Sequence, residues 1–126
     1  MPSPLNFDGG LTISMQVKDR KRSAKWYKDV LGFELEYDVP EIGWCEMRTE
    51  CQKVNFGFSE VESPKSGAGP VPVLGVKDID TARARMEKMD VRFDGATREI
   101  PGMVKLATFF DPDGHALMLY QGLSSQ

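Results

Sequence analysis

The chain has 126 residues, of which 40% are hydrophobic and 28% are charged, and its formal net charge at pH 7 is −3. This length and balance fit one globular domain that buries a core without disulfide bonds. An acidic chain without a basic stretch gives no reason to expect a nucleic-acid partner. Met1-Pro2-Ser3-Pro4 does not resemble a signal peptide, and no apolar run reaches membrane-spanning length. We therefore expect a cytoplasmic protein with no membrane partner.

The two cysteines, Cys45 and Cys51, are too few for a disulfide framework, and free thiols fit the cytoplasm. The chain has no second cysteine pair, and its single histidine, His115, is distant in sequence. A zinc site is therefore not expected. We expect His115 to serve the turn or strand end where it lies, without a catalytic role.

The first elements follow from residue spacing. Apolar and polar residues alternate over 11–17, which predicts a strand with one apolar face. Asp19 is placed to cap a helix, and Gly32 to end it. The helix carries an apolar stripe at helical spacing: Ala24, Tyr27, Val30 and Leu31. Residues 33–37 then read as a second strand.

A hairpin follows, with strands over 44–49 and 53–59 around a short turn near Glu50-Cys51. Alternation divides its side chains between two faces. One face is expected to hold Cys45, Met47, Val54, Phe56 and Phe58. The opposite face is expected to hold Trp44, Glu46, Arg48, Asn55 and Gly57.

Residues 63–70 are rich in Pro, Gly and Ser and read as a linker. Beyond it we expect a strand over 71–76, a helix, and strands over 104–110 and 115–120. The last two are joined by Asp111-Pro112-Asp113-Gly114, a type I turn sequence. The helix is marked by apolar residues at helical spacing: Ile79, Ala82, Met86 and Met89.

The two halves repeat one motif. Val17-Lys18-Asp19 with Ser23-Ala24 returns as Val76-Lys77-Asp78 with Thr81-Ala82, about half the chain later. We therefore predict an α+β fold of two tandem βαβββ modules that form a cupped mixed sheet. The single domain would comprise module one at about 8–62, a linker at about 63–70 and module two at about 71–122.

These motifs resemble the vicinal oxygen chelate superfamily, which includes glyoxalase I, extradiol dioxygenases, fosfomycin-resistance enzymes and bleomycin-binding proteins. The resemblance covers nearly the whole chain, and its carriers are Val17-Lys18-Asp19, Ser23, Trp26-Tyr27, 31–35, 76–80 and 111–115. It implies modules that curl around a cavity and commonly pair across two subunits, so a homodimer is expected.

The resemblance also implies four positions for metal ligands. They fall at Thr12, Val71, Met118 and near Asn55, with Phe56 or Gly57 if the register slips. Valine and methionine cannot replace imidazole or carboxylate donors, and Thr12 and Asn55 offer only weak neutral oxygens. We therefore expect no metal and no cofactor.

The predicted ligand-binding residues follow from which side chains alternate away from the helices. In the second half, Val71, Val73 and Gly75 would face inward, as would Ala116, Met118 and Tyr120, opposite Lys105, Ala107 and Phe109. The predicted ligand-binding set is Thr12, Ser14, Gln16, Trp44, Glu46, Arg48, Asn55, Lys105, Phe109, Met118 and Tyr120. Trp44, Phe109 and Tyr120 are placed to stack on a flat ligand, and Arg48 and Lys105 to pair with an acidic group.

Plainer interpretations stay open: Glu46 and Arg48 as a solvated pair, and Trp44 as packing in a dimer interface. The favoured function is metal-independent binding of a small aromatic or amphipathic molecule. One alternative is a glyoxalase- or dioxygenase-like enzyme, with Glu46 as the weak catalytic candidate, acting as a base or binding metal with Glu60 or Glu62. Another is an interaction module with a collapsed cavity.

Overall fold

The computed structural model describes Pro4, Asn6 and residues 11–66 and 70–123. The chain divides into two compact units, Met1–Pro64 and Lys65–Gln126. Parts of three predicted segments lie outside the described residues. They are residues 1–3 of the N-terminal stretch, residues 8–10 of module one and residues 67–69 of the linker. Among the residues described, no helix is long and apolar enough to cross a membrane.

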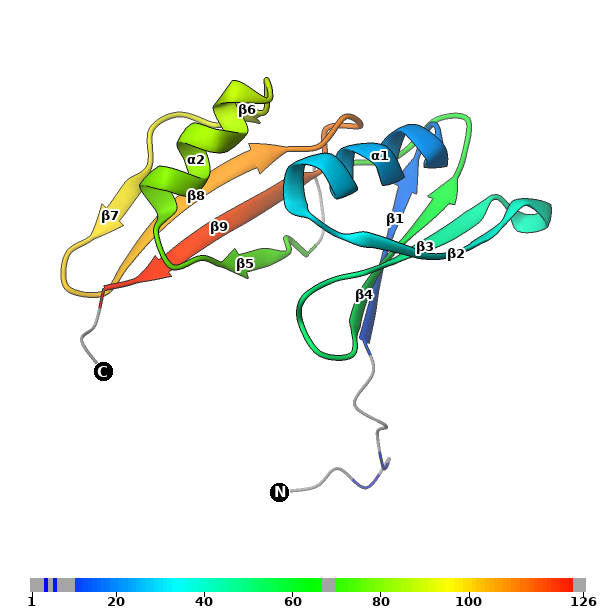
Figure 1. Cartoon of the computed structure of the whole chain (residues 1–126), viewed down its shortest axis with the longest axis horizontal. Coiled ribbons are helices and arrows are strands. Elements are labelled where there is room, and N and C mark those ends of the chain that lie inside the picture. Colours follow the sequence, from blue (N-terminus) through cyan, green and yellow to red (C-terminus); the bar gives the residue numbers. More distant parts are fainter. Residues whose placement is uncertain (1–3, 5, 7–10, 67–69, 124–126) are drawn as a thin grey trace. The chain divides into compact units, whose positions relative to one another are not determined.

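The first unit is a four-stranded sheet with one helix on it (Figure 1). Its elements are β1 (Leu11–Val17), α1 (Arg20–Leu31), β2 (Glu34–Val39), the 3₁₀ turn η1 (Pro40–Ile42), β3 (Trp44–Arg48) and β4 (Val54–Glu60). The strand order is β1-β4-β3-β2. β1 runs parallel to β4, whereas β3 is antiparallel to both of its neighbours.

The predicted ends of α1 are confirmed. The Asp19 carboxylate accepts hydrogen bonds from the backbone N–H groups of Lys21 and Arg22, at 3.0 and 3.1 Å. These groups have no partner within the helix, so the cap satisfies donors that would otherwise be left unpaired. Gly32 ends the helix at φ 77°, a left-handed conformation that glycine adopts at low cost.

Tyr27 is the centre of the core of the first unit, with 0% of its surface exposed. Its ring lies 4.7 Å from that of Phe58, 5.7 Å from that of Phe56 and 5.9 Å from that of Phe33, centroid to centroid. Phe56 and Phe58 of β4 therefore point toward α1. The predicted division of the hairpin faces is confirmed, because Cys45 and Met47 of β3 are buried opposite Phe58 and Phe56.

Arg20 joins α1 to two strands of the sheet. Its guanidinium group contacts Asp38 of β2 at 2.7 Å and Glu60 of β4 at 2.9 Å, and only 11% of the side chain is exposed. Its backbone N–H also donates to Glu60, at 3.0 Å. The start of α1 is thus held by charge-assisted hydrogen bonds on the same face as the apolar core.

The second unit repeats this plan. Its elements are β5 (Val73–Gly75), α2 (Ile79–Lys88), β6 (Arg92–Phe93), β7 (Arg98–Ile100), β8 (Val104–Phe110) and β9 (Ala116–Gly122). β5 runs parallel to β9, β8 is antiparallel to β9, and β6 and β7 both pair with β8. Asp78 caps α2 as Asp19 caps α1, with its carboxylate accepting from the N–H of Thr81 at 3.2 Å. The predicted α+β fold of two repeated modules is confirmed, and each module has its own mixed sheet.

The structure corrects the predicted placement of Lys105 and Phe109. Phe109 lies opposite Leu117, is 0% exposed, and packs against Phe93 at 5.7 Å between ring centroids. Lys105 contacts Asp80 of α2 at 3.2 Å. Both side chains therefore lie on the α2 face. The predicted pairing of β8 with β9 was one residue out of register. The structure places Thr108 opposite Met118, so Ala107 and Phe109 point to the other face.

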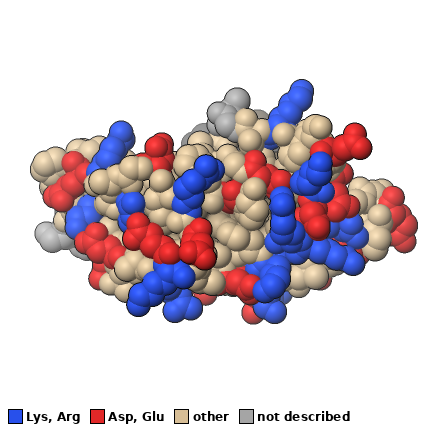
Figure 2. Space-filling view, turned by 90° about the horizontal axis from the view of Figure 1, so that it is seen from above, with Lys and Arg blue, Asp and Glu red and all other residues tan. Residues whose placement is uncertain are grey.

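The outer surfaces of the helices carry mixed charges. Figure 2 shows basic and acidic side chains interspersed on the face in view. Lys25 pairs with Asp29 along α1, and Arg83 with Glu87 along α2, each one helical turn apart. Exposed pairs of this kind contribute little to stability.

Candidate functional site

The candidate site lies on the face of the first sheet that α1 leaves uncovered, here called the helix-free face. The strand register brings four of its side chains together. Thr12 of β1 is opposite Asn55 of β4, Glu46 of β3 is opposite Gly57 of β4, and Tyr37 of β2 is opposite Glu46. One carboxylate is thus surrounded by side chains from all four strands.

Glu46 accepts hydrogen bonds from four side chains: Thr12, Tyr37, Asn55 and Trp44, which precedes it on β3. Its Oε1 accepts from the Tyr37 hydroxyl at 2.7 Å and from the Trp44 indole Nε1 at 3.2 Å. Its Oε2 accepts from Asn55 Nδ2 at 2.9 Å and from the Thr12 hydroxyl at 3.5 Å. Glu46 is 9% exposed. A buried carboxylate needs such partners, and here all four donors are uncharged.

These contacts set the protonation of the cluster. Burial raises the pKa of Glu46, but the hydrogen bonds from Asn55, Tyr37, Trp44 and Thr12 together lower it further, so the net pKa lies below its ordinary value. The pKa of the Tyr37 hydroxyl is raised, chiefly by its hydrogen bond to Glu46. At neutral pH, Glu46 is therefore an anion and Tyr37 a protonated donor.

Trp44 lies against the backbone of β4 at Gly57. A Cβ atom added at Gly57 would stand 2.1 Å from two atoms of the indole ring, which is far inside van der Waals contact. The missing side chain therefore leaves the space that the indole fills. The ring is fixed at one edge by its bond to Glu46 and along its body by the sheet.

Tyr37 was not predicted as a site residue. The β2–β3 register shifts between Leu35 and Tyr37, so one extra residue lies in β2 at this point. Plain alternation from Glu34, which is opposite Arg48, would place Glu36 on the helix-free face. The bulge brings Tyr37 there instead, and no residue in the segment signals it.

Three other predicted residues share this face without bonding to Glu46. Ser14 and Gln16 of β1 are exposed and lie opposite Gly57 and Ser59. Arg48 forms an ion pair with Glu34 of β2, and both side chains are more than half exposed. The interpretation of Glu46 and Arg48 as a pair is therefore wrong, since each has other partners.

The second unit places Met118 and Tyr120 of β9 on its own helix-free face. Met118 is opposite Val73, and Tyr120 is opposite Gly75 and 42% exposed. A Cβ atom at Gly75 would lie 2.9 Å from the Tyr120 ring and hydroxyl, so this ring also rests on a glycine. No carboxylate accompanies these residues on the paired strands β5 and β9.

The residues at the family's metal positions do not fit a metal ion. Thr12 and Asn55 direct their hydrogen-bond donors at Glu46, and Val71 and Met118 offer no hard donor atom. Pairing of Glu46 with Glu60 is wrong, because Glu60 binds Arg20 on the opposite face. In the part of the chain that the structure describes, no group of three or more His, Cys, Asp or Glu side chains is placed to hold a metal.

Two further residues belong to the framework. His115 lies at the end of the turn before β9, where its backbone N–H donates to Asp111 at 2.9 Å. Burial raises the pKa of the Cys45 thiol to about 11, and its Sγ contacts the backbone oxygen of Arg20. Such a thiol is a poor nucleophile at neutral pH.

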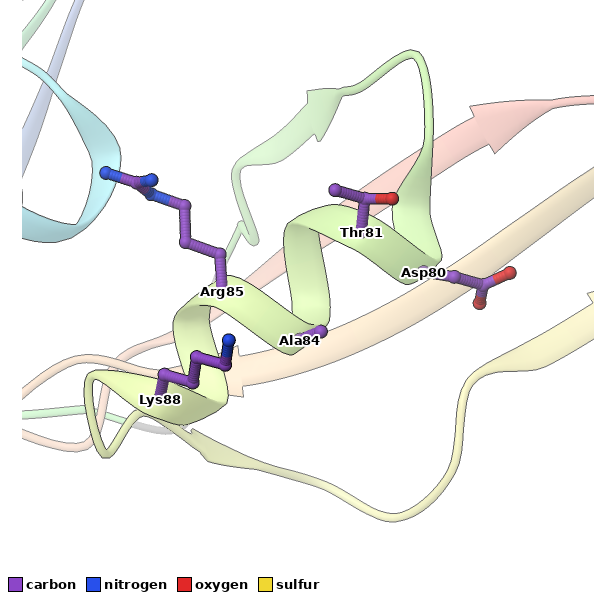
Figure 3. A pocket seen from close by; sticks show the side chains of 5 residues that line it. All are labelled: Asp80, Thr81, Ala84, Arg85 and Lys88. Carbon is purple, nitrogen blue, oxygen red and sulfur yellow. The ribbon is translucent and has the colours of Figure 1, made fainter.

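A hollow also lies along the outer side of α2 (Figure 3). It is lined by Asp80, Thr81, Ala84, Arg85 and Lys88, all of which are exposed. The labelled charged side chains extend from the helix in different directions and do not converge on one point (Figure 3). This hollow is a strip of helix surface and lacks the enclosure of a ligand pocket.

Known proteins share this architecture. A family profile described as Glyoxalase/Bleomycin resistance protein/Dioxygenase superfamily matches residues 11–119. TnmS3, an antibiotic-binding protein from Streptomyces sp. CB03234, aligns at TM-score 0.76 and 24% identity, over 92% of this chain and 97% of that chain. A comparison with curated proteins found no match.

Two other solved structures align over similar lengths. A superfamily member from Sphaerobacter thermophilus DSM 20745 aligns at TM-score 0.78 and 20% identity, over 91% of this chain and 98% of that chain. A lactoylglutathione lyase from Agrobacterium tumefaciens aligns at TM-score 0.71 and 17% identity, over 96% and 97%. At such identities the likeness shows the fold, while the profile match spans most of the chain. The chain therefore belongs to the glyoxalase/bleomycin resistance protein/dioxygenase superfamily.

Proposed function

We propose that this protein binds a small aromatic or amphipathic organic molecule without using a metal, and that the helix-free face around Trp44 and Glu46 is its binding surface. The observation that carries the proposal is the indole of Trp44, which is held against Gly57 while its Nε1 donates to Glu46. A fixed aromatic ring beside a few polar groups suits the recognition of a flat organic molecule.

The chemistry of Glu46 supports binding over catalysis. A general base at neutral pH needs a pKa near 7, and the hydrogen bonds to Glu46 move its pKa the other way. Four hydrogen bonds stabilise its ionised form, which makes it a weaker base. Thr12 and Asn55 are two of the four donors, and their bonds to Glu46 do not suit a role as metal ligands.

The similarity to an antibiotic-binding protein supports the same proposal at the level of ligand size. TnmS3 is described as an antibiotic-binding protein. The fold is thus compatible with binding a small organic molecule. The lactoylglutathione lyase shows that the fold also supports catalysis, so the residues of the site carry the argument.

The test is a thermal-shift screen with aromatic and amphipathic small molecules, followed by ¹H–¹⁵N NMR of the indole groups. A true ligand shifts the Nε1–H signal of Trp44. Trp44→Leu should weaken binding by about tenfold or more, as expected for an aromatic anchor. Trp26→Phe is the matched control, because Trp26 lies on α1, where it packs edge-on against Tyr27.

Binding that is unchanged in Trp44→Leu would overturn the proposed location. Stoichiometric metal in the protein, lost together with an enzymatic activity in Glu46→Ala, would overturn the proposed function in favour of the lyase or dioxygenase class.

We also propose that each chain is a single domain of two modules and that the protein is a cytoplasmic homodimer. The free thiols of Cys45 and Cys51 support a reducing compartment. A dimer interface would cover exposed apolar side chains such as Leu11, Val73 and Met103. Light scattering coupled to size exclusion tests the dimer, and a monomer mass at all concentrations would overturn it.

A further inference from the structure

We propose that the molecule bound on the helix-free face carries a positive charge, as an amine or guanidinium group attached to its aromatic or amphipathic body. This inference rests on the proposed binding function and adds the charge class of the ligand. It reverses the expectation from sequence, which assigned Arg48 and Lys105 to an acidic ligand.

The charges on the helix-free face do not balance. The strand register places three charged side chains on it, namely Glu34, Glu46 and Arg48 of the described strands β2 and β3. Arg48 and Glu34 form an ion pair with each other. Glu46 has only uncharged partners, so its negative charge is not compensated by any of the residues that bond to it.

The cationic groups expected to bind an acidic ligand already have partners. Arg48 pairs with Glu34. Lys105 belongs to the second unit, where it pairs with Asp80 on the α2 face of the sheet. An anionic ligand on the helix-free face would meet a buried carboxylate in place of a positive anchor. Like charges brought together in a partly desolvated site repel strongly, which selects against such a ligand.

The two carboxylate oxygens of Glu46 are hydrogen-bonded unequally. Oε1 accepts two hydrogen bonds, from Tyr37 and Trp44. Oε2 accepts one short bond from Asn55 at 2.9 Å and a contact from Thr12 at 3.5 Å, the outer limit for such a bond. Thr12 is exposed. A ligand ammonium entering past Thr12 would replace this weak contact with a charge-assisted hydrogen bond.

Two aromatic rings lie beside the carboxylate. They are those of Tyr37 and Trp44, both of which donate to Oε1. Aromatic faces attract cations, and a carboxylate beside them adds to the same negative field. One end of the ligand would thus meet Oε2, and its apolar body would lie along Trp44.

The experiment compares three probes that share one ring system: 1-naphthylmethylamine as the cation, 1-naphthalenemethanol as the neutral form and 1-naphthoate as the anion. Binding is followed at neutral pH by the Nε1–H signal of Trp44, in a Trp26→Phe background where it is the only indole signal. We expect the amine to bind about tenfold more tightly than the alcohol, with the acid weakest. Added salt should reduce the advantage of the amine.

Two variants isolate the charge of Glu46. Glu46→Gln keeps the side-chain size and should reduce the amine to the affinity of the alcohol. Glu46→Gln/Asn55→Asp returns one carboxylate to the cluster, next to an amide donor, and should restore the preference for the amine. The amide spectrum of each variant shows whether it is folded. The effect of salt on amine binding is measured with Glu46 in place, so that test remains even if a variant does not fold.

The outcomes separate the two proposals. If the alcohol or the acid shifts the Trp44 signal at equal or lower concentration than the amine, the charge inference is overturned and the binding function stands. If no probe shifts the signal up to its solubility limit, the binding function itself is overturned at this site. A preference for the amine that persists in Glu46→Gln would also overturn the inference, because the charge of Glu46 would not be its source.

Discussion

Trp44 and Gly57 depend on each other across the β3–β4 hairpin. The ring occupies the space where a side chain at position 57 would begin, and this contact determines the direction in which the indole nitrogen points. That nitrogen then reaches Glu46 on the same strand, at 3.2 Å. The position of one anchor of the proposed ligand surface thus follows from the absence of one methyl group.

Gly57→Ala should displace the Trp44 ring. The added carbon would meet the indole at 2.1 Å in a buried strand, so the ring must move, and we expect a loss of about 1–3 kcal/mol of stability from overpacking. The Nε1–H signal of Trp44 should shift as its bond to Glu46 breaks. Gly122→Ala is the control, because a Cβ there has open space and the backbone has no positive φ. Equal stability and an unmoved indole signal in Gly57→Ala would contradict this account.

Tyr37→Phe should raise the pKa of Glu46, because it removes the shortest hydrogen bond to the ionised carboxylate. Glu46 has a lowered pKa in the folded protein, so its stabilising effect is present above the unfolded pKa and is lost as pH falls through the folded value. In the variant the folded pKa lies closer to the unfolded one, so this contribution should be smaller and its loss should be complete at higher pH. A ¹³C NMR titration of the Glu46 carboxyl group measures the change. Tyr120 is not among the residues that bond to Glu46, so Tyr120→Phe is the control and should leave the titration of Glu46 unaltered.

At the scale of elements, Arg20 connects α1 to β2 and β4. Arg20→Met should lower the melting temperature clearly, because it leaves Asp38 and Glu60 facing each other without their shared cation. Lys25→Met removes the exposed pair with Asp29 from the same helix and should have little effect. Similar melting temperatures for the two variants would show that the network is not structurally important.

The effect of Arg20→Met should depend on pH. Arg20 holds the pKa of Asp38 below its ordinary value of 3.8, chiefly through their hydrogen bond. The stability from this interaction is present above pH 3.8 and is lost as pH falls through the lower folded pKa. The difference in stability between wild type and variant should therefore narrow below pH 3.8. Urea unfolding at several pH values measures it, and a constant difference would contradict the assignment.

Alternation and capping residues were sufficient to predict most elements of this chain. Asp19 and Gly32 gave the ends of α1, and the hairpin faces follow from Phe56 and Phe58 against Trp44 and Glu46. Two short strands, β6 and β7, escaped prediction because two or three residues carry no periodic pattern. Tyr37 and Phe109 were misjudged for one reason: a bulge in β2 and the pairing register of β8 each shift parity by one residue.

At the scale of the whole molecule, one module is used twice with different chemistry on its helix-free face. Asp19 and Asp78 cap equivalent helices, and each sheet contains a parallel pair with an aromatic ring over a glycine. The first face centres on a carboxylate, whereas the second presents Val73, Met118 and Tyr120. Repetition therefore predicts the framework, and the site depends on residues that the repeat does not share.

The same difference predicts that this superfamily member retains no metal. After incubation with Ni²⁺, Zn²⁺, Mn²⁺ and Fe²⁺ and then desalting, elemental analysis should find far less than one ion per chain, because the implied positions Thr12, Asn55, Val71 and Met118 lack suitable donors. A chelator should leave the melting temperature unchanged, since only a bound ion would contribute to stability.

Thr12→His/Asn55→His provides the matched comparison. These positions are opposite each other on β1 and β4, and both contact Glu46, so the variant brings two imidazoles and one carboxylate together. That donor set is one that zinc binds in proteins. Zinc retained by this variant and not by the wild type would show that the scaffold keeps the geometry for a metal and that the side chains alone withhold it. Stoichiometric metal in the wild type, lost in Glu46→Ala, would contradict the prediction, because Glu46 would then be a ligand despite its four hydrogen bonds.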